Sequence, residues 1–269
     1  MTKQVSILGC GWLGFPLARA MMAAGWEVRG STRSGGNLAN LKAAGIQAFK
    51  IILGENAIEG NMKEFLGSSA LLIISVPPGL RSGSGEDYVK KMALVQRSLA
   101  PSQVKQLVFV SSTSVYGNIT GQVTEQTSPA PVTESGRQVL DAENVFRNDR
   151  GLETIIIRFG GLIGPNRHPV THLSGKSGLR GGDDPVNLIH QEDAILLIQN
   201  VVRDNHWNMI FNGVYPAHPK KKVYYNREAR KRNLSAPEYQ EETNQPGSKI
   251  VISKNYLTYN YSFYASIFG

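Results

Sequence analysis

Residues 4–14 read QVSILGCGWLG, a short apolar run followed directly by glycines at the spacing G-x-G-x-x-G. The run predicts a buried strand, and the apolar spacing over residues 13–24 predicts a helix after the turn. Glycines in such a turn allow a tight bend, close approach of a pyrophosphate and close packing of helix on strand. The start of the helix would offer free amides to the phosphates. The alternative is that the glycines serve packing alone.

Strand and helix patterns alternate along the rest of the chain. Helix-length segments, such as 87–99, 137–147 and 192–202, separate short apolar runs. The runs lie at residues 27–32, 48–53, 70–76, 106–111, 153–159 and 209–214. Strands that alternate with helices at this spacing pair in parallel through crossovers. We therefore predict an α/β fold with a Rossmann-type doubly wound parallel sheet.

The pattern loosens after Pro165, where a glycine- and proline-rich stretch predicts a long loop. We expect residues 1–164 to form the dinucleotide-binding Rossmann core. Residues 165–269 form a mixed region, of which 188–215 would complete the core. A small C-terminal annex on the substrate side would comprise 165–187 and 216–269.

The end of the chain carries two further patterns. Residues 249–253 predict a strand, and the alternation of Leu257, Tyr259, Tyr261 and Phe263 predicts another, laid on an apolar surface. The aromatic side chains could equally form the contact of a homodimer.

Composition narrows the class of protein. The chain has 269 residues, of which 41% are hydrophobic and 19% charged, as expected for a folded α/β domain. The single Cys10 excludes an internal disulfide, so we expect a reducing cytoplasm. The apolar stretch 5–22 is broken by Pro16 and Arg19, which argues against a secretory leader. No other run approaches the roughly 18 apolar residues that span a bilayer, so we expect no membrane partner.

The net charge of +8 arises mostly from one segment. Residues 216–235 contain seven Lys or Arg residues and one acid, Glu228. A solvated basic helix explains this segment most simply, and an anionic substrate bound by it is the second explanation. General nucleic-acid binding is not expected, because no nucleic-acid motif accompanies the charge.

The end of the second predicted strand indicates which dinucleotide is preferred. A site for NAD places an acidic side chain there to accept from the ribose 2′-hydroxyl. This chain has Thr32, Arg33 and Ser34 instead, and a guanidinium suits a 2′-phosphate. We therefore expect NADP(H), with NAD as the alternative. Arg33 could also simply point to solvent.

Three further stretches carry a recognisable pattern: residues 108–117 read VFVSSTSVYG, residues 157–165 read IRFGGLIGP and residues 189–194 read IHQEDA. Together they resemble the extended short-chain dehydrogenase/reductases, the NAD-dependent epimerase/dehydratase family. The glycine turn and the pair Pro77-Pro78 are most similar to an atypical subgroup. The resemblance covers roughly residues 4–215.

In that family a Ser, a Tyr and a Lys four residues after the Tyr perform the chemistry. Ser112 matches the Ser. Counting back from Ala142-Glu143, which resembles the end of the family's catalytic helix, places Ser135 at the Tyr position and Val139 at the Lys position. No tyrosine in the chain is followed by a lysine four residues later. The usual Tyr/Lys dyad is therefore expected to be absent.

Other groups near the expected site could take part in the chemistry. Tyr116 could donate a proton and Arg137 could stabilise negative charge, with His190 as a later candidate. Each has a plainer explanation: Tyr116 could serve packing, and Arg137 could cap a helix or pair with another side chain on it. His168 and His172 lack an accompanying carboxylate, so no metal is expected.

We thus expect an NADP(H)-binding protein of the short-chain dehydrogenase/reductase type. It would be an oxidoreductase or epimerase acting on a small polar or anionic substrate with non-standard catalytic residues. The alternatives are a non-catalytic NADP(H) sensor and, third, a structural protein that binds no nucleotide. The expected catalytic residues are Ser112, Tyr116 and Arg137. The expected cofactor residues are Gly9, Gly11, Trp12, Leu13, Gly14, Thr32, Arg33, Ser34, Val76, Pro77, Ser111 and Phe159.

Overall fold

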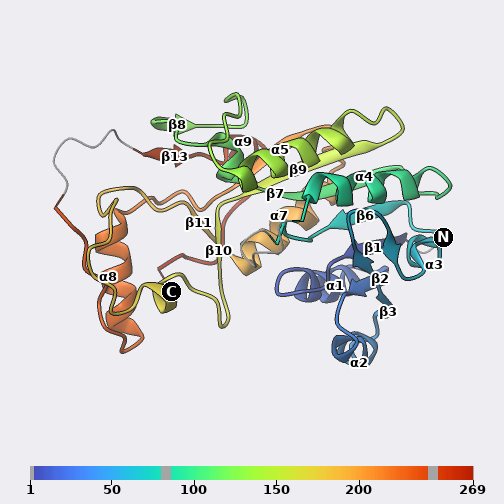
Figure 1. The fold of residues 1–269 in the computed structure, drawn as a ribbon, viewed down its shortest axis with the longest axis horizontal. Coiled ribbons are helices and arrows are strands. Elements are labelled where there is room, and N and C mark those ends of the chain that lie inside the picture. The colour runs from blue at the N-terminus through green and yellow to red at the C-terminus, as the bar shows by residue number, and fades with distance from the viewer. Residues whose placement is uncertain (1–2, 80–85, 242–247, 269) are drawn as a thin grey trace.

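A parallel sheet of seven strands forms the centre of the molecule (Figure 1). The computed structural model describes residues 3–79, 86–241 and 248–268. The strand order β12-β9-β7-β6-β1-β2-β3 reverses direction at β1, as in a doubly wound fold. The strands are β1 (Lys3–Leu8), β2 (Trp26–Thr32), β3 (Gln47–Lys50), β6 (Leu71–Ile74), β7 (Gln106–Ser112), β9 (Glu153–Phe159) and β12 (Ile210–Gly213). The predicted α/β fold is confirmed.

Helices cover both faces of the sheet. One apolar cluster joins the sheet to α1 and α7, and a second joins the opposite face to α3, α4 and α5. Successive strand residues such as Ile73 and Ile74 belong to different clusters, because side chains alternate across a strand. The helices of this core are α1 (Gly14–Ala23), α2 (Gly36–Ala43), α3 (Met62–Leu66), α4 (Tyr88–Leu99), the 3-10 turn η2 (Thr113–Tyr116), α5 (Glu134–Arg147) and α7 (Gln191–Arg203). Among the described residues no helix is long and apolar enough to cross a membrane.

Short paired strands and short helices are the other regular elements of the described chain. The pairs are β4 (Ile52–Leu53) with β5 (Ile58–Glu59), β10 (Gly161–Ile163) with β11 (Leu188–His190), and β8 (Gly121–Val123) with β13 (Lys249–Val251). The remaining helices are α6 (Val170–Leu173), α8 (Lys221–Lys231) and α9 (Lys254–Thr258).

The end of the chain differs from its prediction. Residues 249–251 form the expected strand, but 254–258 form α9 instead of continuing an alternating strand. Tyr256 is fully buried in the cluster shared with α1 and α7, and Tyr261 and Phe263 pack against it. This part of the tail therefore packs on the core. The homodimer expected from these aromatic residues stays a prediction.

The region expected to form the annex includes α8, which lies at the opposite end of the molecule from β3 (Figure 1). Its apolar cluster includes Tyr224 and Tyr225 of α8, Val170 of α6 and Ile267 near the end of the chain. Two aspartates balance part of the positive charge: Lys220 and Lys222 pair with Asp183 at 2.8 and 3.1 Å, and Lys221 pairs with Asp184 at 2.9 Å. The local charge excess inferred from the segment alone is therefore smaller in the folded protein.

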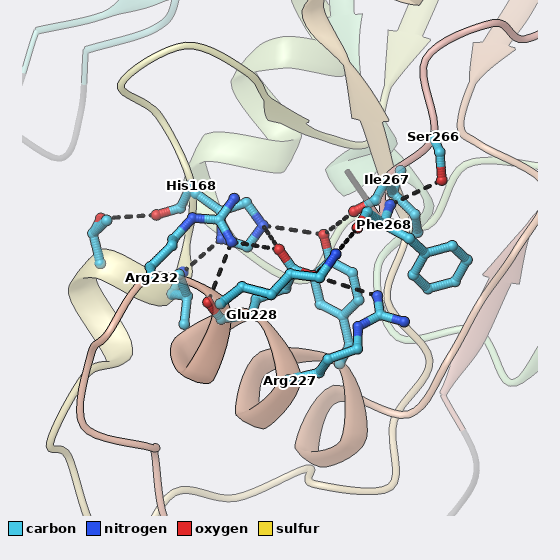
Figure 2. Close-up of polar contacts among 11 residues, drawn as sticks. His168, Arg227, Glu228, Arg232, Ser266, Ile267 and Phe268 are labelled. Carbon is cyan, nitrogen blue, oxygen red and sulfur yellow. Dashed lines mark hydrogen bonds and ion pairs between the residues drawn. The ribbon is translucent and has the colours of Figure 1, made fainter.

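A buried carboxylate on α8 lies beside the contact that joins this helix to the end of the chain (Figure 2). Glu228 is 1% exposed, and Arg232 and Arg227 bind it. The Tyr224 hydroxyl donates to the carbonyl of Ile267 at 2.8 Å and lies 3.0 Å from Nε2 of His168. The amide of Val170 donates to Nδ1 of His168, so the proton of the neutral ring is on Nε2.

This arrangement predicts how stability depends on pH. Burial, followed by the charge of Arg232, lowers the pKa of His168 from 6.5 to about 4. Between pH 6.5 and 4, therefore, His168 binds a proton in the unfolded chain but not in the folded protein. The free energy of unfolding falls as the pH drops through this interval. We expect His168 to contribute up to about 3 kcal/mol to this fall.

Urea unfolding at a series of pH values checks this expectation. His168→Gln should reduce the slope of unfolding free energy against pH in that interval. The control, His172→Gln, removes an exposed imidazole from the same part of the chain. An unchanged slope in His168→Gln would contradict the expectation.

Candidate dinucleotide site

The glycine turn lies at the carboxyl end of β1, and each of its glycines has a different reason to lack a side chain. Gly9 has a φ of +98°, and a Cβ there would lie 2.8 Å from Val76. A Cβ on Gly14 would lie 2.1 Å from the carbonyl oxygen of Gly9, so Gly14 allows the helix to pack on the turn. A Cβ on Gly11 would meet nothing within 4 Å. Packing therefore explains Gly9 and Gly14 but leaves Gly11 without a structural reason.

The turn also presents unpaired amides. Within the described chain, no hydrogen-bond acceptor is found for the amides of Trp12, Leu13 and Gly14. They stand at the start of α1, where the helix dipole is positive. The predicted Trp12, Leu13 and Gly14 thus lie together around the space at Gly11, an arrangement that fits a pyrophosphate.

The end of β2 is bonded directly to this turn. The Ser31 hydroxyl accepts from the amide of Gly9 at 2.9 Å, and the amide of Cys10 donates to the Ser31 carbonyl at 2.7 Å. Burial raises the pKa of the Cys10 thiol to about 12, so this cysteine stays protonated and serves packing.

The polar residues after β2 are open to solvent or bonded to each other. The amide of Ser34 donates to the Thr32 hydroxyl at 3.2 Å. Arg33 is exposed and forms no ion pair or hydrogen bond with any described residue. The structure thus brings a free guanidinium to the same edge of the sheet as the glycine turn. Contact of Arg33 with the 2′-phosphate of a bound nucleotide stays a prediction.

The segment after β6 completes one wall of the site. Val76 lies next to Gly9, and its carbonyl accepts from the Tyr88 hydroxyl at 2.7 Å. Pro77 follows and is exposed. These two predicted residues therefore adjoin the turn.

Ser111 and Phe159, by contrast, have side chains engaged in the protein interior. Ser111 is 6% exposed, and its hydroxyl donates to the Glu143 carboxylate. That carboxylate also accepts two hydrogen bonds from Arg158, at 2.6 and 2.9 Å, and both charged groups are buried. Phe159 is 2% exposed and belongs to the core. Any cofactor contact of these two residues stays a prediction.

The three residues expected to take part in chemistry occupy different surroundings. Ser112 is partly exposed at the end of β7, and its hydroxyl accepts from the amide of Ser114 at 3.1 Å. Tyr116 is fully buried: its ring lies 4.9 Å from the Arg158 guanidinium, and its hydroxyl donates to Asn212 at 2.8 Å. Arg137 is exposed and binds Glu134 one turn earlier on α5 at 3.1 Å. Only Ser112 and Arg137 are therefore open to a substrate.

Helix α5 carries the two residues expected from the sequence at the positions of the family's Tyr and Lys, and this assignment stays a prediction. Ser135 is partly exposed near its start, and Val139 is 4% exposed in an apolar cluster with Tyr116. His190 caps α7, accepting weakly from the amide of Glu192 at 3.4 Å. In the described chain, no group of three or more His, Cys, Asp or Glu side chains could hold a metal ion.

A loop from the second half of the chain covers the turn, which the sequence did not indicate. The indole of Trp12 donates to the Pro165 carbonyl at 2.9 Å, and the Arg167 guanidinium stacks 4.9 Å from its ring. The Gln191 side chain donates to the Trp12 carbonyl at 2.6 Å. These contacts join residues more than 150 positions apart, so no local pattern could have revealed them.

Comparisons with known proteins agree with this geometry. Residues 5–177 match the model of the NAD dependent epimerase/dehydratase family. Protein YeeZ of Escherichia coli K12 is 34% identical over 252 residues, which cover 93% of this chain and 91% of YeeZ. The UDP-glucuronic acid 4-epimerase of Bacillus cereus, solved with NAD, superposes with a TM-score of 0.80 at 15% identity, covering 98% of this chain and 94% of that one.

Proposed function

The chain belongs to the NAD-dependent epimerase/dehydratase family, and from that premise we propose that it binds NADP(H) at the glycine turn. The observation that carries the proposal is the open space at Gly11, beside three amides without acceptors. The free Arg33 supports NADP(H) over NAD(H), because a 2′-phosphate would pair with its guanidinium. NAD(H) would occupy the same site with lower affinity.

The proposed reaction is a hydride transfer on a small polar or anionic substrate, as an oxidoreductase or an epimerase. The nicotinamide supplies the hydride chemistry when bound. Ser112 would orient the substrate oxygen, and the exposed Arg137 would bind negative charge on the substrate. Proton donation by Tyr116 would require it to break its hydrogen bond to Asn212, so the buried surroundings favour the packing role for this residue.

A non-catalytic NADP(H) sensor is the second candidate. Ser135 and the buried Val139 favour it, since neither can act as the acid/base pair of the family. Two assays distinguish the candidates: consumption of NADPH with a panel of small carbonyl compounds identifies an oxidoreductase, and epimerisation of a hydroxylated compound without net consumption of nucleotide identifies an epimerase. Nucleotide binding with neither activity identifies a sensor.

Titration calorimetry with NADPH and NADH tests the cofactor assignment. We expect Arg33→Ala to weaken NADPH binding by about 10- to 100-fold, which is the effect of losing one or two charge-assisted hydrogen bonds. Binding of NADH should change little, because NADH has no 2′-phosphate. Arg147→Ala, which removes another exposed arginine, is the control. Equal losses for both nucleotides would refute the role given to Arg33, and no binding of either would refute the site.

A further inference from the structure

A pocket of about 590 Å³ lies between one face of α8 and the segment that follows this helix. Its volume is within the range of small-molecule sites. The helix wall is formed by residues of a single helical face: Lys222, Val223, Asn226, Arg227 and Arg230. The opposite face of α8, with Tyr224 and Glu228, is buried. The residues of the helix wall therefore point away from the annex core and into the pocket.

The second wall of the pocket is held in place by main-chain hydrogen bonds. It consists of Ala236, Pro237, Glu238 and Tyr239. The amide of Glu238 donates to the Lys176 carbonyl at 2.9 Å, and the carbonyl of Glu238 accepts from the amide of Leu179 at 3.1 Å. The amide of Gln240 donates to the Leu179 carbonyl at 2.9 Å. The fold therefore fixes this wall at a set position opposite α8.

Positive charge exceeds negative charge in the pocket lining. Arg230 is exposed and forms no ion pair or side-chain hydrogen bond with any residue that the structure describes. Lys222 and Arg227 each share a single carboxylate with another cation. The one acid in the lining is Glu238, and no cation of the described chain pairs with it. A pocket with this lining attracts an anion.

The two arginines of the lining favour a phosphate group. Arg227 and Arg230 are three positions apart on α8, so their side chains are neighbours on the helix surface. The Arg227 guanidinium also lies 4.2 Å from the ring centre of Phe268, which supports it from the side (Figure 2). The N–H groups of guanidinium match phosphate oxygens. A phosphate monoester offers three such oxygens and about −1.5 to −2 charges at neutral pH, whereas a carboxylate offers two oxygens and one charge.

An apolar surface lies beside the arginines. Val223 is one helical turn before Arg227, and 59% of its surface is exposed to solvent. Pro237 and the partly buried Tyr239 line the facing wall. An apolar or aromatic group between these residues would remove the valine from water, which is favourable. The pocket is therefore complementary to an anion that carries such a group.

We propose that this pocket binds a phosphate monoester whose organic part is apolar or aromatic. Arg227 and Arg230 hold the phosphate, Lys222 adds positive charge, and Val223 and Tyr239 contact the organic part. Among the described residues, none that lines the pocket belongs to the proposed dinucleotide site, and α8 lies at the opposite end of the molecule from β3 (Figure 1). The inference thus goes beyond the proposed function and does not rest on it.

Calorimetric titration of the full-length protein with three matched probes tests the site. Phenyl phosphate carries both features, benzoate places a carboxylate on the same ring, and inorganic phosphate lacks the ring. We expect phenyl phosphate to bind more tightly than either of the others by about threefold or more. Equal affinities for phenyl phosphate and benzoate, or for phenyl phosphate and inorganic phosphate, would overturn the proposal. No binding in the millimolar range would overturn it as well.

Substitutions in the two walls locate the bound probe. Arg230→Gln should weaken phenyl phosphate by about 10-fold. Val223→Ser should weaken phenyl phosphate by about threefold and leave inorganic phosphate unchanged. Glu238→Gln removes the acid of the lining, so it should strengthen phenyl phosphate binding by about two- to fivefold. The control is Arg147→Gln, which removes an exposed arginine of α5 and should have no effect.

The opposite signs of two of these effects separate binding from folding. Arg230 and Glu238 are both exposed, so neither substitution should unfold the protein. Damage to the fold would weaken binding in both variants, whereas the proposal requires a loss in Arg230→Gln and a gain in Glu238→Gln. Unchanged affinity in Arg230→Gln, weaker binding in Glu238→Gln, or an equal loss in Arg147→Gln would overturn the proposal.

Discussion

Gly11→Ala should fold like the wild type yet bind NADPH about 100-fold more weakly. A Cβ at this position meets no protein atom within 4 Å, so the substitution creates no clash inside the protein. It does place a methyl group in the space beside the free amides of Trp12 and Leu13, where the pyrophosphate would lie. Calorimetry with NADPH measures the loss, and urea unfolding measures the stability, which could rise by about 0.5 kcal/mol because alanine restricts the unfolded chain.

Two other glycines provide the comparison. Gly35→Ala, also with nothing within 4 Å of its added Cβ, should leave NADPH binding unchanged and raise stability by a similar amount. Gly14→Ala should reduce both, since its Cβ would lie 2.1 Å from the Gly9 carbonyl oxygen. If Gly11→Ala binds NADPH as tightly as the wild type, the turn serves packing alone and the central proposal fails.

Glu143→Gln should destabilise the protein by about 3–5 kcal/mol. The carboxylate is fully buried and accepts two hydrogen bonds from Arg158 and one from Ser111. Removing its charge leaves the guanidinium of Arg158 buried without a counter-ion, and Nη1 of that residue already lacks a partner. The free energy of unfolding in urea, measured at neutral pH, reports the loss.

A matched variant exists on the same helix. Glu134 pairs with Arg137 at 3.1 Å, but both side chains are more than half exposed, so Glu134→Gln should change stability by at most about 0.5 kcal/mol. The double substitution Glu143→Leu with Arg158→Met should recover much of the stability lost in Glu143→Gln, because it removes both buried charges. Similar losses in Glu134→Gln and Glu143→Gln would contradict this account of the buried pair.

Local pattern was sufficient to predict the core of the fold. The strand expected at residues 153–159 has those bounds in the structure. The strand expected at 106–111 is one residue longer and ends at Ser112. The helix expected at 87–99 begins one residue later, since Asp87 is its cap. These elements follow from apolar periodicity and capping, which depend on neighbours in the chain.

Local pattern failed where contacts with distant residues decide the local structure or the local charge. Alternation over 257–263 predicted a strand, but the packing of Tyr256 on the core selected helix α9. The basic segment looked uncompensated because its partners, Asp183 and Asp184, lie almost 40 residues earlier. Periodicity and local charge contain no information about such partners.

The sequence by itself determined the Rossmann core, the glycine turn and the absence of an acid after β2, because each depends on residues within about one strand, turn and helix of each other. Only the tertiary structure decided which side chains surround that core. It buried Tyr116 against Arg158, placed the loop of Pro165 on Trp12, and joined the side chain of Asn187 to the main chain of Lys249. These contacts join distant parts of the chain, so they form only when the whole fold closes, and their energies depend on burial, which no local stretch of sequence specifies.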